Sequence, residues 1–139
     1  MGRRKVIAVS GGFDPLHIGH VRMICAAAAL GDVAVILNND NWLLNKKGFV
    51  FMPESERREI LLAIRGVTKV VITKHERSAL DRSVCAELRE LKPDVFCNGG
   101  DRVKSNTPEA SLCRELGIET LYDVGVGGKV QSSSWLLHR

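Results

Sequence analysis

Residues 6–20 read VIAVSGGFDPLHIGH. The apolar run at 6–9 predicts a short buried strand, and the glycines after it predict a tight turn whose backbone N–H groups can approach a ligand. A helix beginning near Ile18 would point the positive end of its dipole toward the same place. A strand, a glycine turn and a helix start in this order predict an anion site and favour phosphate as the anion.

Two histidines, His17 and His20, stand at the start of the predicted helix. A single histidine there is most often a helix cap or a surface residue, so neither alone would point to catalysis. Positions i and i+3 share one helix face, so both imidazoles can reach one anion. Asp14, just upstream, has the chemistry to orient an imidazole or to hold a metal ion. The pair therefore indicates phosphoryl chemistry.

The rest of the chain alternates strand-like and helix-like patterns. Short, mostly β-branched runs are typical of buried parallel strands, and they occur at 6–9, 33–37, 70–72, 95–97 and 119–122. Helical patterns are expected at 18–30, 54–64, 81–91 and 108–116, with a last helix from about residue 134. We expect one α/β domain over residues 1–139, a Rossmann-like, doubly wound parallel sheet of five strands with its ligand at the carboxyl ends.

Composition excludes several classes of protein. A chain of 139 residues with 45% hydrophobic content suits a single compact domain. The net charge of +4 is mild and its basic residues are dispersed, which gives no support to nucleic-acid binding. The four cysteines are far apart, which indicates neither a zinc site nor a disulfide framework. We expect a cytoplasmic protein that binds no membrane, because no signal peptide and no bilayer-spanning apolar stretch is found.

The stretch GFDPLHIGH, residues 12–20, resembles the signature of the HIGH-motif nucleotidyltransferase superfamily, which includes the cytidylyltransferases and the small adenylyltransferases. Class I aminoacyl-tRNA synthetases carry a similar motif, but this chain is too short for their anticodon-binding body. The resemblance implies that His17 and His20 are catalytic. It also implies a nucleotide site lined by Gly11, Gly12, Phe13, Asp14 and Gly19.

A long polar connection, residues 38–52, follows the second predicted strand. Such connections are often functional. In the resembled family a lysine here contacts the substrate phosphates, and either Lys46 or Lys47 could fill that role, the alternative being a solvated lysine pair. Arg57 resembles a family arginine that faces the site and binds nucleotide; Arg58 could equally be that residue, and either could instead pair with glutamates on the helix surface.

Two glycines follow the predicted strand at 95–97, where they would let a nucleotide approach the backbone closely. A surface turn is the alternative. The segment resembles an element of glycerol-phosphate, ethanolamine-phosphate and heptose-phosphate nucleotidyltransferases that helps form the base and ribose pocket. The nucleotide-binding residues implied are Asn98, Gly99, Gly100 and Asp101.

Three consecutive serines, Ser132, Ser133 and Ser134, precede the last predicted helix. They resemble the second signature of the superfamily, and the resemblance implies that they bind the β- and γ-phosphates. Lys129 stands near the arginine of the cytidylyltransferase pattern, which implies a catalytic role. The segment departs from the Arg-Thr-x-Gly-Ile-Ser-Thr form of the glycerol- and choline-phosphate enzymes.

The implied reaction is transfer of a nucleoside monophosphate from a nucleoside triphosphate to a small phosphorylated alcohol or sugar, with release of pyrophosphate. Mg²⁺ is the expected cofactor, held mainly by phosphate oxygens and water, with Asp14 nearby. CTP is the first choice of donor, and adenylyl transfer from ATP to a sugar phosphate such as heptose 1-phosphate is the alternative. A non-catalytic nucleotide-binding module is a further alternative, which the intact histidine pair disfavours. Family members often form homodimers through the segment matching residues 64–70, where Gly66 here replaces the usual aromatic residue.

Overall fold

The computed structural model describes residues 4–97 and 107–121. Within them, five strands form one parallel sheet in the order β3-β2-β1-β4-β5. The strands are β1 (Val6–Gly11), β2 (Asp32–Leu37), β3 (Val67–Ile72), β4 (Val95–Cys97) and β5 (Glu119–Leu121). In this order β1 is the central strand. The chain adds β2 and β3 on one side of it and then crosses over to add β4 and β5 on the other side. The predicted Rossmann-like, doubly wound sheet is therefore confirmed.

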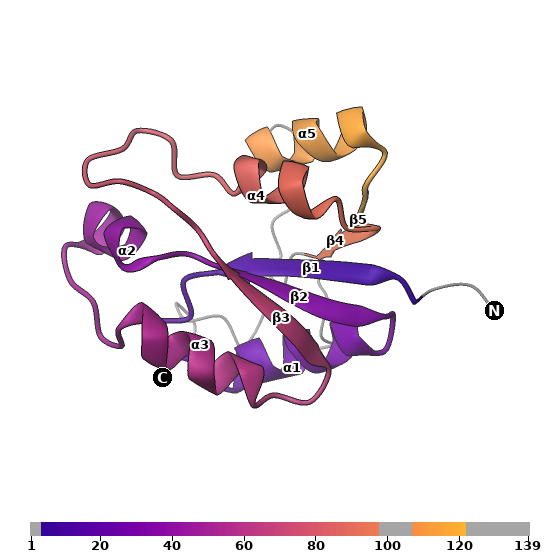
Figure 1. Ribbon diagram of the computed structural model, residues 1–139, viewed down its shortest axis with the longest axis horizontal. Coiled ribbons are helices and arrows are strands. Elements are labelled where there is room, and N and C mark those ends of the chain that lie inside the picture. Colours follow the sequence, from indigo (N-terminus) through magenta and orange to yellow (C-terminus); the bar gives the residue numbers. More distant parts are fainter. Residues whose placement is uncertain (1–3, 98–106, 122–139) are drawn as a thin grey trace.

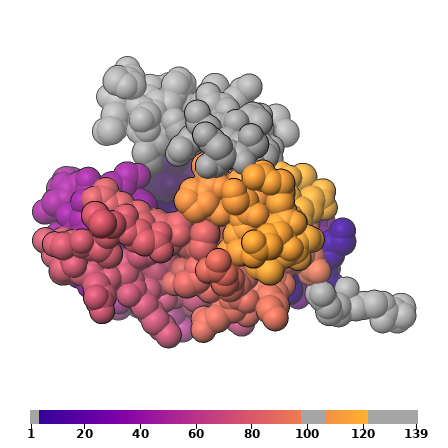
Figure 2. Space-filling model, turned by 90° about the horizontal axis from the view of Figure 1, so that it is seen from above, coloured from indigo at the N-terminus to yellow at the C-terminus, as the bar shows by residue number. Residues whose placement is uncertain are grey.

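Helices cover both faces of the sheet (Figure 1). The helices α1 (Ile18–Ala28) and α3 (Glu54–Leu62) lie on one face, and α4 (Cys85–Leu91) and α5 (Pro108–Leu116) lie on the other. Alternate residues of the strands supply the two cores. Val35 packs in the first core with Ile24 of α1, whereas Ile36 packs in the second with Leu88 of α4. Figure 2 looks onto the second face and shows α5 beside the segment that leads into α4.

One further helix, α2 (Asp40–Lys47), lies in the stretch that was expected to be a long polar connection. The sequence of α2 is polar and has no apolar stripe, but residues typical of helix caps stand at its two ends. The Asn39 side chain caps it by accepting the Trp42 N–H at 2.9 Å, and Gly48 ends it in the left-handed region at φ 83°. The expectation of an extended loop over the whole of 38–52 was wrong.

Some element boundaries differ from the predicted ones for local reasons. The helix α4 begins at Cys85 rather than at Asp81, because the Asp81 carboxylate accepts the Ser83 N–H at 2.9 Å and forms a turn of its own. The helices α1 and α3 end two residues early, and β3 begins three residues early. The α5 boundaries are confirmed, since Thr107 caps its start and Gly117 ends it at φ 72°.

Two glycines are required by close backbone packing. Ala29 is the C-cap of α1, and a Cβ at Gly31, two residues later, would overlap the carbonyl of Lys5, the residue before β1. Gly66 adopts φ 98°, and a Cβ there would overlap the Ala28 side chain. Glycine at position 66 therefore allows the residue before β3 to lie close to the last residue of α1. The homodimer stays a prediction.

Among the described residues, no helix combines the length and the apolarity that a bilayer crossing needs. The four cysteines are free thiols. Cys97 and Cys113 are buried, and burial raises the pKa of each thiol to about 11, whereas Cys25 is exposed. The two buried thiols are packing residues of low reactivity.

Candidate active site

The HIGH-like motif occupies the loop between β1 and α1, at the carboxyl end of the central strand. This is the point where the strand order reverses, since β2 pairs with one side of β1 and β4 with the other. Ligands of open α/β sheets bind at such points. The glycines let neighbours approach: a Cβ at Gly12 would lie 3.2 Å from both Trp42 and Leu43 of α2, and one at Gly11 would lie 3.3 Å from the Phe13 ring.

The two histidines cap α1 reciprocally. His17 Nδ1 accepts the Gly19 N–H at 3.0 Å, and His20 Nδ1 accepts the His17 N–H at 3.2 Å. The two rings stack with centroids 3.8 Å apart. Because a neutral imidazole carries one proton, acceptance at both Nδ1 atoms assigns both protons to Nε2. The capping role is thus compatible with the predicted catalytic role, since the two roles would use different nitrogens.

Burial keeps both imidazoles neutral. It lowers the pKa of His17, and burial together with the nearby His17 lowers the pKa of His20 to about 3. Phe13 supports His20, with ring centroids 4.9 Å apart in an edge-on arrangement. Phe13 itself is buried in the core, so the structure gives it a packing role, and its contact with the nucleotide stays a prediction. Near neutral pH the pair presents N–H donors without a charge of its own.

Asp14 holds the segment after α2 against the motif. Its buried carboxylate accepts the N–H groups of Phe51 at 2.8 Å and Met52 at 2.6 Å. Lys47 Nζ lies 3.0 Å from the same carboxylate and donates to the Asp14 carbonyl at 2.8 Å. Burial alone would raise the pKa of Asp14, but the bonds from Phe51, Lys47 and Met52 hold it below its usual value. Neither histidine is oriented by Asp14 in the contacts described.

The helical phase of α2 separates the two candidate lysines. Lys47 points to Asp14 and so lies beside the histidine motif. Lys46 lies over the Trp42 ring, with its Nζ 4.8 Å from the ring centroid. The described contacts therefore place Lys47 beside the histidine motif, and which lysine binds a substrate phosphate stays a prediction.

Arg57 is fully buried and bonds to four protein groups within 2.8 Å. Three are backbone carbonyls and one is a carboxylate: Met52 O, Gly12 O, Asn38 O and Asp40 Oδ1. These groups belong to the motif loop, the end of β2, the start of α2 and the segment before α3. Arg57 is thus a positioning residue that joins the walls of the site, and its predicted contact with the nucleotide stays a prediction. Its neighbour Arg58 is exposed.

Several predicted site residues lie outside the described residues: Asn98, Gly99, Gly100, Asp101, Lys129, Ser132, Ser133 and Ser134. The strand that precedes the first of them is described. Cys97, the last residue of β4, pairs with Val9 of β1, so the carboxyl ends of β4 and β1 are neighbours. In the described part of the chain, no three His, Cys, Asp or Glu side chains gather as a metal ligand set.

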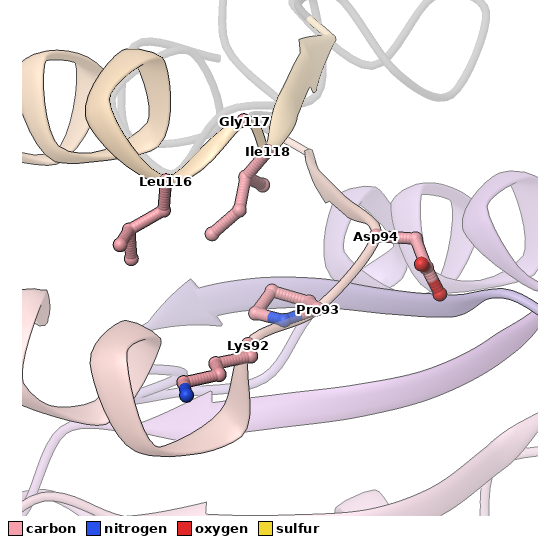
Figure 3. A pocket seen from close by; sticks show the side chains of 6 residues that line it. All are labelled: Lys92, Pro93, Asp94, Leu116, Gly117 and Ile118. Atoms are coloured by element: carbon pink, nitrogen blue, oxygen red, sulfur yellow. The ribbon is translucent and has the colours of Figure 1, made fainter.

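A cleft of about 400 Å³ lies at the opposite, amino end of the sheet (Figure 3). Its lining precedes β4 and β5 and consists of Lys92, Pro93, Asp94, Leu116, Gly117 and Ile118. The Asp94 carboxylate already accepts the Val6 N–H at 2.7 Å. This cleft therefore lies far along the strands from the histidine motif and does not form the candidate site.

Comparison with known proteins agrees with the motif and the fold. The cytidylyltransferase-like family model matches residues 8–124. The chain is 35% identical over 137 residues to the bifunctional protein HldE of Streptomyces coelicolor, covering 96% of this chain and 28% of HldE. It is 38% identical over 104 residues to the FAD synthase of Pyrococcus abyssi, covering 73% of this chain and 67% of that enzyme.

The solved structure of a lipopolysaccharide core biosynthesis protein from Thermoplasma volcanium has the same fold, with a TM-score of 0.67 at 21% identity over 86% of this chain and 95% of that one. The chain spans 28% of the length of HldE. The family model, in contrast, extends over most of this chain, from β1 beyond β5. The motif, the strand order and this match agree, and the chain belongs to the cytidylyltransferase-like family of nucleotidyltransferases.

Proposed function

We propose that this protein transfers a nucleoside monophosphate from a nucleoside triphosphate to the phosphate of a small acceptor and releases pyrophosphate. The reciprocal cap of α1 carries the proposal. Each Nδ1 is committed to the helix start, so His17 and His20 present neutral N–H donors through Nε2 at the carboxyl end of β1. Such donors stabilise the charge that develops on phosphoryl oxygens.

The proposed reaction needs no strong base. The acceptor phosphate is already ionised near neutral pH, and its oxygen attacks the α-phosphorus in line. The new P–O bond forms as the bond to the bridging oxygen breaks, and pyrophosphate leaves with that electron pair. His17 and His20 donate to the α-phosphoryl oxygens and the leaving group, and Lys47, held by Asp14, neutralises the acceptor phosphate. Lys129 and the three serines are assigned to the β- and γ-phosphates on sequence grounds.

Mg²⁺ is the proposed cofactor, and it supplies charge neutralisation to the triphosphate when bound. Asp14 does not fit as its ligand in this arrangement, because its carboxylate already accepts two backbone N–H groups and the Lys47 ammonium. Phosphate oxygens and water therefore remain the proposed ligands. The role that the geometry supports for Asp14 is to position Lys47 and residues 48–53.

ATP is the proposed donor. The similarity to an FAD synthase of which the alignment covers 67% supports this choice, since FAD is made by joining an adenylyl group to FMN. Cytidylyl transfer from CTP, the first expectation from the sequence, stays the alternative, supported by the family match.

Pyrophosphate release tests the proposal. CTP, ATP, GTP and UTP are each supplied with Mg²⁺ and with FMN, glycerol 3-phosphate, phosphocholine, phosphoethanolamine or heptose 1-phosphate. We expect release with one triphosphate that depends on one acceptor class. Release of pyrophosphate without an acceptor would indicate a hydrolase instead. Triphosphate binding by the folded protein without release from any pair would favour the non-catalytic module.

A further inference from the structure

The segment that joins β3 to α4, residues 73–84, passes beside α2 and is bonded to it (Figure 1). The Asn41 side chain donates from Nδ2 to the His75 carbonyl at 3.0 Å. One turn further along the helix, Asn45 Oδ1 accepts the Ser78 N–H at 2.8 Å. Polar side chains of α2 therefore hold this segment in place at the carboxyl end of the sheet.

The indole of Trp42, in the first turn of α2, links the same segment to the motif loop. Its Nε1 donates to the Arg82 carbonyl at 2.9 Å. The opposite edge of the ring lies against Gly12, where a Cβ would be 3.2 Å from Cζ3 and 3.8 Å from Cε3. A side chain at position 12 would compete with the indole for this space, and glycine leaves the space to the ring. The Gly12 carbonyl also accepts a bond from Arg57 at 2.7 Å, so two side chains hold the motif loop at this residue.

The same indole also fixes the place of a cation. Lys46 follows Trp42 by about one helical turn, and its Nζ lies 4.8 Å from the centroid of the ring. The face of an indole attracts an ammonium group more strongly than a phenyl face does. A lysine side chain without such a contact would sample many rotamers in water. The Lys46 ammonium and the Gly12 backbone are therefore held relative to each other through one side chain.

We infer that Trp42 is a positioning residue, which keeps the Lys46 ammonium beside the motif loop so that its charge strengthens the binding of the nucleoside triphosphate. The inference rests on the proposed function, and it adds a residue that the proposed reaction does not yet use. The two lysines are held by different means. Lys47 is paired with the Asp14 carboxylate, whereas an indole holds an ammonium without cancelling its charge. A charge that is fixed before the ligand arrives binds an anion more tightly than one that must first be ordered.

Equilibrium binding tests this role without requiring turnover. ATP and CTP, each with Mg²⁺, are titrated into the full chain in a calorimeter. Lys46→Met and Trp42→Leu should each weaken triphosphate binding about tenfold, the scale for one lost charged hydrogen-bond donor. Trp42→Phe keeps an aromatic face and loses the Nε1 donor, so it should weaken binding only about threefold. Asn45→Ala is the matched control: it removes a bond to the same segment, keeps the bond from the indole to Arg82, and should leave binding unchanged.

A double variant separates a positioning role from a purely structural one. Because Trp42 acts through Lys46, the double variant Trp42→Leu, Lys46→Met should bind no more weakly than Lys46→Met alone. Additive losses, about a hundredfold together, would overturn the positioning role. In turnover, Trp42→Leu should raise the KM for the triphosphate and leave kcat near that of wild type. A variant that is merely less folded would instead show a lower apparent kcat with an unchanged KM.

Fluorescence tests the contact between the indole and the ammonium without any ligand. The chain has two tryptophans, so Trp42 is the only one left in the Trp135→Phe protein. Adding Lys46→Met to that protein should change the tryptophan emission, because the cation over the ring is removed. An unchanged emission spectrum would overturn the positioning role.

The failures of the two proposals are distinguishable. Non-additive loss of triphosphate binding, without pyrophosphate release from any pair of substrates, would support the positioning role and reject only the transferase. Pyrophosphate release with the same KM for the triphosphate in wild type and Trp42→Leu would keep the transferase and overturn the positioning role.

Discussion

The two ends of the parallel sheet differ in what they hold. At the carboxyl end, Arg57 and the Asp14 carboxylate are buried and bonded to several segments, and two stacked histidines cap the adjoining helix. At the amino end lies an open cleft of about 400 Å³, in which Asp94 is tied to the Val6 backbone. The candidate site thus lies at the end of the sheet opposite to this cleft. What distinguishes the carboxyl end is polar side chains fixed by the protein before any ligand arrives.

There is a physical reason to hold these polar side chains in place before a ligand binds. A transition state is stabilised most by donors that need not reorganise as charge develops. At the carboxyl end, Arg57 and Asp14 join segments that are far apart in the chain. Arg57 donates to the Gly12 carbonyl of the motif loop, and Asp14 in that loop accepts from the segment that follows α2. The comparison therefore predicts that substitutions at the two ends will differ in kind as well as in size.

The largest effect is expected at Arg57. Arg57→Ala would leave three carbonyls and the partly exposed Asp40 carboxylate without their donor, so it should lower the free energy of unfolding by about 3–5 kcal/mol. Urea denaturation followed by circular dichroism measures the change. The neighbouring and exposed Arg58→Ala is the control and should change stability by less than about 0.5 kcal/mol. Equal effects of the two variants would refute the positioning role of Arg57.

A large effect on catalysis without loss of fold is expected at His20. Glutamine is a normal residue at this position of a capping box, so His20→Gln should keep the cap and remove the imidazole donor. Turnover should fall by about 10²–10³-fold, the scale for one lost donor to a developing oxyanion. Leu116→Ala, in the amino-end cleft, should leave turnover unchanged. A His20→Gln enzyme with wild-type turnover would remove His20 from the reaction.

The same variant should change the response of stability to pH. The pKa of His20 is about 3 in the folded protein and 6.5 in its ordinary state, so between these values the unfolded chain binds more protons. The contribution of this histidine to stability is therefore complete above pH 6.5 and is lost progressively as the pH falls toward about 3. Between pH 7 and pH 4, His20→Gln should lose less stability than wild type. Parallel stability profiles for the two proteins would contradict a partly buried imidazole that stays neutral in the folded protein.

The smallest effect is expected at the amino end. Gly117 adopts φ 72° with open space around its Cβ position, so Gly117→Ala should cost only the left-handed strain of about 1 kcal/mol. Gly117→Asn should cost less, because asparagine tolerates this conformation better. Thermal unfolding measures both, and turnover should not change. A loss of turnover in either variant would mean that the two ends are coupled.

Much of the fold could be predicted from local pattern. Each of the five strands overlaps one of the short, mostly β-branched runs singled out in the sequence, and the α5 boundaries follow from Thr107 and Gly117. The helix α2 was missed because its polar sequence has no apolar periodicity, although the Asn39 cap and the glycine at position 48 signalled it. Local signals thus sufficed wherever an element buries an apolar face.

The candidate site was predictable in its position and less so in its geometry. Two histidines three residues apart indicated the anion site, but that their Nδ1 atoms cap the helix and leave the protons on Nε2 depends on the backbone around them. The choice between Lys46 and Lys47 depends on the phase of a helix that the sequence did not reveal. The burial of Arg57 arises from four acceptors on segments far apart in the chain, which no local pattern encodes.

The most direct test of nucleotidyl transfer follows the fate of each phosphate. ATP and CTP labelled either at the α- or at the γ-phosphorus are incubated with the acceptor that supports pyrophosphate release, and the products are separated. The proposed reaction predicts that the α-label enters the acceptor and the γ-label leaves as pyrophosphate, and that His20→Gln slows both together. Transfer of the γ-label to the acceptor, or its release as inorganic phosphate, would contradict it.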